Sequence, residues 1–121
     1  MLKYPSMRYE LVADLESLAG LDVSPGALDI AIRWVLDSSS LGDEPAEAAI
    51  GLVLHDPDEA ALVSVLVRCL HDLVTTSGGP LSEDGYRARP EWPAIERAAA
   101  AAHARLIEND RRFPGTYDEG A

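Results

Sequence analysis

Cysteine, lysine and long apolar runs are scarce in this chain of 121 residues. Cys69 is its single cysteine, which excludes an intrachain disulfide and therefore a secreted framework held by disulfides. No stretch free of charged residues approaches the roughly 20 residues of a membrane-spanning helix. The N-terminal segment MLKYPSMRYELVADL also lacks an apolar core of signal-peptide length. We therefore expect a cytoplasmic protein that does not engage a membrane.

Basic side chains are few in comparison with acidic ones. Ten Lys and Arg face 21 Asp and Glu, giving a net charge of −11. Nucleic acid and anionic membranes are therefore not expected partners, because both are bound through clustered Lys and Arg. Between Arg33 and Arg68 no basic residue interrupts seven acids, which are Asp37, Asp43, Glu44, Glu47, Asp56, Asp58 and Glu59. These seven are interpreted either as a solvated surface that keeps the protein soluble or as a face for a basic protein partner.

The apolar pattern predicts an all-α fold. With 47% hydrophobic residues the chain fits one domain of ordinary size. We predict a single-domain bundle of about five helices over residues 1–109 and a loose tail over residues 110–121. Helices are expected over Pro5–Leu18, from Ser24-Pro25 to the loop at 38–45, over 46–54, from the Asp56 cap to about Thr76, briefly within 81–88, and from Pro90 or Pro93 to about Asn109.

One of these segments leaves a choice open. Residues 46–54 read as a short helix, although Ile50–Leu54 also suits a buried strand; a helix is preferred because no second strand is evident to pair with it. In the second helix the expected buried residues are Ala27, Ile30, Ala31, Trp34 and Val35.

The helix after Asp56 is the best defined. Asp56 suits the N-cap, Pro57 the first helical position, and Glu59 the spacing of a capping box. Apolar residues occur almost all round residues 57–76. Such a helix either lies at the centre of a bundle or buries a second face, for example against another copy in a homodimer.

His-Asp pairs at 55–56 and 71–72, with Cys69 nearby, are the obvious candidates for chemistry. Cys69 and His71 would point about 200° apart on a helix, and His55 and His71 would lie roughly 24 Å apart along it. No metal site is therefore expected, and His71 is not oriented by its neighbour Asp72. Nucleotide-binding and serine-hydrolase signatures are absent as well. We expect no catalytic residue, metal or cofactor. The alternative is a small enzyme or ligand-binding bundle with a pocket near Trp34 and Trp92.

Three short motifs carry a family resemblance: Tyr4-Pro5-x-Met7-Arg8, Asp56-x-x-Glu59 and Tyr86-x-x-x-Pro90-x-Trp92-Pro93. Over residues 4–107 the chain resembles a group of small, acidic, actinobacterial-type helical proteins of uncharacterised function. The resemblance implies no enzyme activity. Small acidic proteins of this kind include immunity and antitoxin components, so by analogy the sequence favours a non-enzymatic interaction protein with a basic partner.

Overall fold

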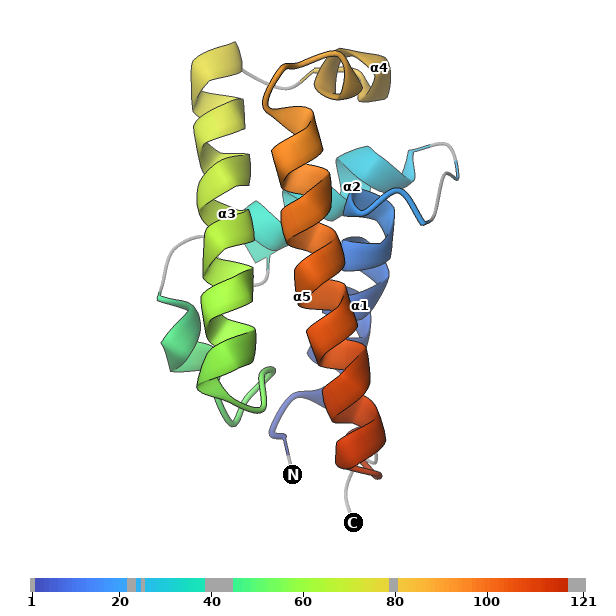
Figure 1. The fold of residues 1–121 in the computed structure, drawn as a ribbon, viewed down its shortest axis with the longest axis vertical. Coiled ribbons are helices and arrows are strands. Elements are labelled where there is room, and N and C mark those ends of the chain that lie inside the picture. Colours follow the sequence, from blue (N-terminus) through green and yellow to red (C-terminus); the bar gives the residue numbers. More distant parts are fainter. Residues whose placement is uncertain (1, 22–23, 25, 39–44, 79–80, 118–121) are drawn as a thin grey trace.

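Three long helices carry the fold, and each has a proline within its first two positions. They are α1 (Pro5–Leu18), α3 (Pro57–Ser77) and α5 (Trp92–Arg112). The computed structural model describes residues 2–21, 24, 26–38, 45–78 and 81–117. α5 packs against both α3 and α1 and runs antiparallel to α3 (Figure 1).

Shorter elements complete the bundle. They are α2 (Ala27–Arg33), which continues as a π-helical turn over Trp34–Ser38, a 3₁₀ turn over Ala46–Ala49, and α4 (Glu83–Arg87). The predicted all-α fold with about five helices is confirmed for the described residues. The helix prediction for residues 46–54 is correct only as far as Ala49. Ile50 is already extended (ψ 128°), which ends the helix, and Gly51 follows in a left-handed conformation (φ +86°). Ile50 and Leu54 form one isolated bridge instead of a strand.

The core lies where the three long helices meet. Its buried residues form one stripe along each of these helices: Leu11, Leu15 and Leu18 on α1; Ala60, Val63, Leu66, Leu70 and Leu73 on α3; Ile95, Ala99, Ala102 and Leu106 on α5. The alanines of α5 leave room for the neighbouring helices to approach closely. At the N-terminal end of α5, Trp92 is buried beside Tyr86, with ring centroids 6.3 Å apart.

The prediction for the second helix is wrong in two respects. α2 begins at Ala27, after Gly26 in a left-handed conformation (φ +82°), and not at Ser24-Pro25. Its buried residues are Leu28, Ala31, Ile32 and, in the π turn, Val35, while Ile30 is 60% exposed. Two overlapping apolar faces share Ala31 and Val35, and only packing against α1 selects between them.

α3 is less evenly buried than its composition suggests. One face is buried, its flanks are half-buried against the core, and a stripe with Ala61, Val65 and Arg68 is exposed. Among the described helices, α3 alone is long and apolar enough to span a membrane by composition. The central helix of a bundle meets the same criterion, and α3 packs along α5.

The predicted loose tail is wrong for residues 110–117. α5 continues to Arg112, and the turn that follows packs back, with Thr116 only 5% exposed. Thr116 and Tyr117 make hydrogen bonds to the helical body, which no composition pattern indicates. Residues 118–121 lie outside the described residues.

Candidate functional site

A buried ion pair joins α1 to α3 beneath the helix start at Asp56. Arg8 and Glu59 are both fully buried and form a two-point pair, with Nη1–Oε1 2.8 Å and Nη2–Oε2 2.9 Å apart. Arg8 also donates to the backbone oxygens of Val53 (3.0 Å) and Leu106 (3.1 Å), and through Nε to Asp110 (2.9 Å). All five N–H groups of the guanidinium are thereby satisfied. Burial lowers the pKa of Arg8, but its bonds to Glu59 and the charges of Glu59 and Asp110 raise it by more.

The carboxylate of Glu59 is equally saturated. Besides Arg8, it accepts the backbone N–H of His55 (2.7 Å) and the side-chain amide of Asn109 (2.7 Å), so each oxygen receives two hydrogen bonds. A carboxylate with four donors and no exposed surface has no lone pair left for a substrate or a metal ion. Arg8, Glu59 and Asn109, with Asp56, form what we call the buried polar cluster. Arg8 balances Glu59 within the cluster, and Arg105 pairs with Asp56 from outside it, which is the arrangement of a structural element.

Asp56 caps α3 and connects it to α5. Its side chain accepts the Glu59 backbone N–H (2.9 Å), the Asn109 amide (2.9 Å) and Arg105 (3.4 Å). Partial burial opposes ionisation of Asp56, but these three donors outweigh it and hold its pKa below the usual value. The predicted cap is confirmed. The Glu59 side chain, however, reaches back to the N–H of His55 and not to that of Asp56 as in a standard capping box.

His55 packs the C-terminal turn onto the cluster. Its Nε2 lies 3.1 Å from Thr116 Oγ1, and the Thr116 hydroxyl donates to the Phe113 backbone oxygen (2.6 Å). Since that hydroxyl proton is used, Nε2 must carry the proton in the His55–Thr116 bond. The ring also lies against Phe113, with centroids 4.7 Å apart. Burial, followed by the charge of Arg8, lowers the pKa of His55.

The remaining members of the His-Asp motif lie apart from this cluster. His71 and Asp72 are exposed on the last turns of α3, and Cys69 is half-buried. Within the described ranges, no three His, Cys, Asp or Glu side chains converge as metal ligands would.

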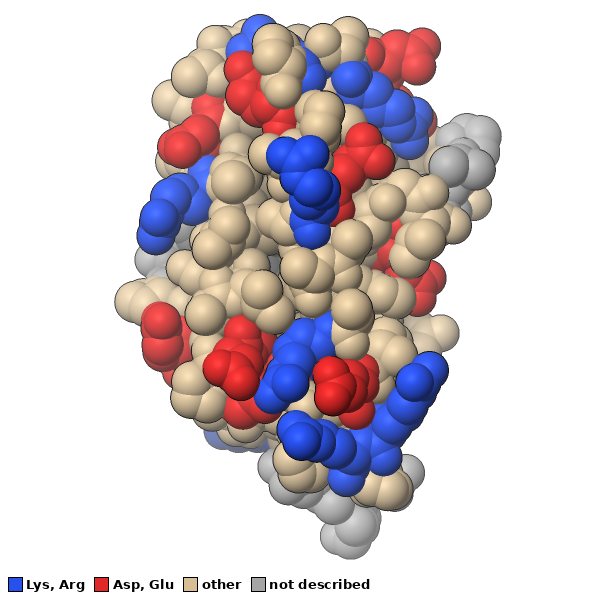
Figure 2. Space-filling model, viewed as in Figure 1, with Lys and Arg blue, Asp and Glu red and all other residues tan. Residues whose placement is uncertain are grey.

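The seven acids predicted to form a partner face are divided by the structure. Glu47 and Asp58 are exposed, whereas Asp56 is a half-buried cap and Glu59 is fully buried. Glu59 therefore cannot contact a partner, and its inclusion in the face is a wrong prediction. Asp43, Glu44 and the side chain of Asp37 lie outside the described part. The face formed by α3 and α5 shows charges of both signs toward its two ends and an uncharged middle, with no continuous acidic patch (Figure 2).

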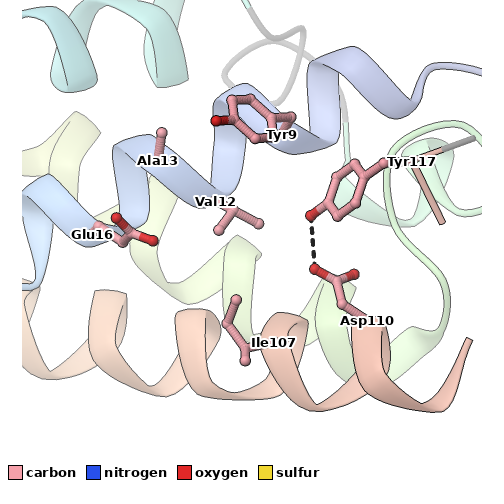
Figure 3. A pocket seen from close by; sticks show the side chains of 7 residues that line it. All are labelled: Tyr9, Val12, Ala13, Glu16, Ile107, Asp110 and Tyr117. Carbon is pink, nitrogen blue, oxygen red and sulfur yellow. Dashed lines mark hydrogen bonds between the residues drawn. The ribbon is translucent and has the colours of Figure 1, made fainter. Parts of the chain in front are cut away.

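A groove between α1 and α5 was not indicated by any motif. It has a volume of about 370 Å³ and is lined by Tyr9, Val12, Ala13 and Glu16 of α1, Ile107 and Asp110 of α5, and Tyr117 (Figure 3). A second hollow of about 220 Å³, lined by Pro5, Ser6, Tyr9 and Tyr117, adjoins it at the two tyrosines. The Tyr117 hydroxyl donates to Asp110 (2.7 Å); burial, and then this bond and the Asp110 charge, raise the pKa of Tyr117.

Sequence reasoning also missed the buried polar cluster, although a signal for it exists. Arg8, Glu59 and Asn109 each continue an apolar stripe of their own helix: Arg8 precedes Leu11 and Leu15, Glu59 precedes Val63 and Leu66, and Asn109 follows Ala102 and Leu106. Polar side chains in register with a buried stripe must find partners inside the protein. One basic, one acidic and one amide residue on three helices therefore indicate a shared network.

Asp14 is a separate buried carboxylate. It is 6% exposed, and its Oδ2 has no hydrogen-bond partner among the described residues. Burial, with a smaller contribution from the charge of Glu10, raises the pKa of Asp14 from 3.8 to about 7. Burial therefore destabilises the ionised form of Asp14. Asp14 belongs neither to the groove nor to the buried polar cluster.

Comparison with known proteins gives one match. The model of a family described as "Domain of unknown function (DUF7945)" matches residues 2–114. No curated protein and no solved structure matches the chain.

Proposed function

We propose that this chain, which belongs to the DUF7945 family of domains of unknown function, is a non-enzymatic interaction domain for a basic protein partner. The observation that carries the proposal is a contrast between two sets of charges. Inside, the ionised groups of the buried polar cluster are saturated with hydrogen bonds. Outside, exposed carboxylates without an ion pair to any described residue include Glu10, Glu47, Asp72 and Asp84.

The excess of negative charge supports a partner of opposite sign. With a net charge of −11, the domain sets up a field that attracts basic proteins and speeds their association at low ionic strength. An exposed tyrosine adds contact area at the groove, where Tyr9 is 67% exposed. Tyrosine is enriched where proteins bind each other.

More specifically, we propose that the domain is an immunity or antitoxin protein. A toxin that cleaves nucleic acid carries basic side chains to hold phosphates, and an acidic domain competes for that same surface. The cytoplasm is the compartment in which we place this activity.

The experiment is affinity purification from the native host followed by calorimetric titration of the captured protein. We expect a basic protein whose affinity falls at least tenfold between 50 and 300 mM NaCl, and falls further when Asp43, Glu44 and Glu47 are changed to lysine. The comparison variant reverses three exposed acids elsewhere, Glu10, Asp72 and Asp84, and changes the net charge by the same amount; it should lower the affinity less. Binding that ignores both salt and charge reversal contradicts the proposal.

Two other functions have an observation in their favour. The groove has a volume suited to a small ligand, and stabilisation of the domain by a metabolite in a thermal shift screen would support a ligand-binding role. The uncharged middle of the α3–α5 face suits a homodimer contact (Figure 2). α3 also exposes the apolar residues Ala61 and Val65. Sedimentation velocity at micromolar concentration separates a dimer from a monomer.

A further inference from the structure

We infer that the groove between α1 and α5 receives a cationic side chain, arginine or lysine, from the partner protein. This inference rests on the proposed function and adds to it the point of contact.

Two tyrosines form the mouth of the groove. The rings of Tyr9 and Tyr117 meet edge to face, with centroids 6.0 Å apart, and both are substantially exposed. Tyr117 is held in place by its hydrogen bond to Asp110, so this wall is already fixed before a ligand arrives (Figure 3). The faces of tyrosine rings attract ammonium and guanidinium groups within about 6 Å.

The charges at the groove select a cation. Glu16 and Asp110 line it, and no lysine or arginine does so within the part of the chain that the structure describes. Asp110 is already engaged, since it accepts both Arg8 (2.9 Å) and Tyr117 (2.7 Å). Glu16 is freer: among the described residues its carboxylate has one polar contact, His103 Nε2 at 3.3 Å, and its side chain is 43% exposed. Glu16 is therefore the counter-charge for an incoming cation.

The floor suits the stem of such a side chain. Val12, Ala13 and Ile107 offer apolar surface between the carboxylate of Glu16 and the tyrosine pair. Arginine and lysine carry three or four methylene groups behind their charge and cover apolar surface in this way. An anionic ligand would instead bring like charge against Glu16 and Asp110.

The test is an NMR titration of the ¹⁵N-labelled domain with acetyl-Gly-Arg-Gly-amide. The reference peptide has citrulline in place of arginine, which keeps the shape and removes the charge. We expect saturable shifts at Tyr9, Ala13, Ile107 and Tyr117 with the arginine peptide alone. Affinity should fall about two- to fivefold in Tyr9→Ala and in Glu16→Gln, as expected for a cation–π contact and an exposed charge pair.

The matched controls are Tyr4→Ala and Glu10→Gln, since both residues are exposed near α1 but line neither hollow. Equal shifts with the citrulline peptide, shifts centred elsewhere, or equal losses in the control variants would overturn the inference. If the captured partner binds in a salt-dependent way but is indifferent to Tyr9→Ala and Glu16→Gln, the groove is not the contact and the proposed function stands. If the captured partner's binding does not depend on salt, the proposed function itself fails.

Discussion

Arg8 of α1 and Glu59 of α3 meet in the interior through two hydrogen bonds of 2.8 and 2.9 Å, and neither side chain has exposed surface. The pair links segments 51 residues apart in the sequence. Its neighbours Asn109 and Asp110 extend the link to α5. One network of charge-assisted hydrogen bonds therefore sets the relative positions of all three long helices.

Removing one member of the pair should destabilise the fold strongly. Arg8→Met leaves the Glu59 carboxylate buried without its counter-charge, and we expect a loss of about 3–5 kcal/mol in urea denaturation. The double variant with Glu59→Leu should recover part of this loss, with a coupling of about 1–3 kcal/mol. Arg33→Met is the control, because Arg33 pairs with Asp29 on the surface and should cost less than about 0.5 kcal/mol. Additive losses in the two single variants would contradict this account.

The cap at Asp56 should contribute to stability in a pH-dependent way. Asp56→Ala removes an acceptor from three donors, and we expect a loss of about 1–2 kcal/mol at pH 7. Because the pKa of Asp56 is lowered in the folded state, this stabilisation is present above the unfolded value near pH 4 and is lost as the pH falls through the folded value. Asp58→Ala is the control, since the Asp58 side chain is 76% exposed. An equal loss in both variants would argue against a capping role.

Asp14 should make the folded protein less stable as the pH rises, which is the opposite of the effect of Asp56. The folded protein retains a proton on Asp14 up to a pKa of about 7, whereas the unfolded chain loses it near 3.8. The free energy of unfolding therefore decreases as the pH rises through this window. Asp14→Asn should be more stable than the wild type by about 1–3 kcal/mol at pH 8, with little difference at pH 4. Denaturation at both pH values measures this, with Asp72→Asn as the exposed control. If the difference in free energy of unfolding between Asp14→Asn and the wild type is the same at both pH values, burial does not destabilise the ionised form of Asp14.

The C-terminal turn should behave as part of the folded domain. A chain that ends after Arg112 loses the contacts of Thr116 with His55 and of Tyr117 with Asp110, and we expect a loss of about 1–2 kcal/mol. A chain that ends after Tyr117 keeps both contacts and serves as the control. If the chain that ends after Arg112 unfolds at the same temperature as the full chain, the prediction of a loose tail would be restored.

The parts of the fold that sequence reasoning found are those set by local chemistry. Pro5, the Asp56-Pro57 cap and Gly78 mark helix ends through interactions within a few residues, and these boundaries were predicted correctly. The buried face of α2 was not, because two apolar faces overlap in its sequence and contact with α1 chooses between them. The tail was missed because Thr116 and Tyr117 are polar residues whose partners lie 61 and 7 positions away.

The candidate sites depend even more on contacts between distant segments. Asp56 and Glu59 look like surface acids in the sequence, yet their partners Arg8, Arg105 and Asn109 come from other helices and draw them inward. The groove is formed by α1, α5 and the terminal turn together, and no single segment carries a motif for it.

The association rate constant of the captured partner, measured by surface plasmon resonance at 50 and 300 mM NaCl, tests the central claim most directly. The account predicts a rate that falls at least tenfold at the higher salt concentration, and a Tyr9→Ala variant whose dissociation is faster while its association is nearly unchanged. An association rate that is the same at both salt concentrations would contradict the claim that this acidic domain recognises a basic protein.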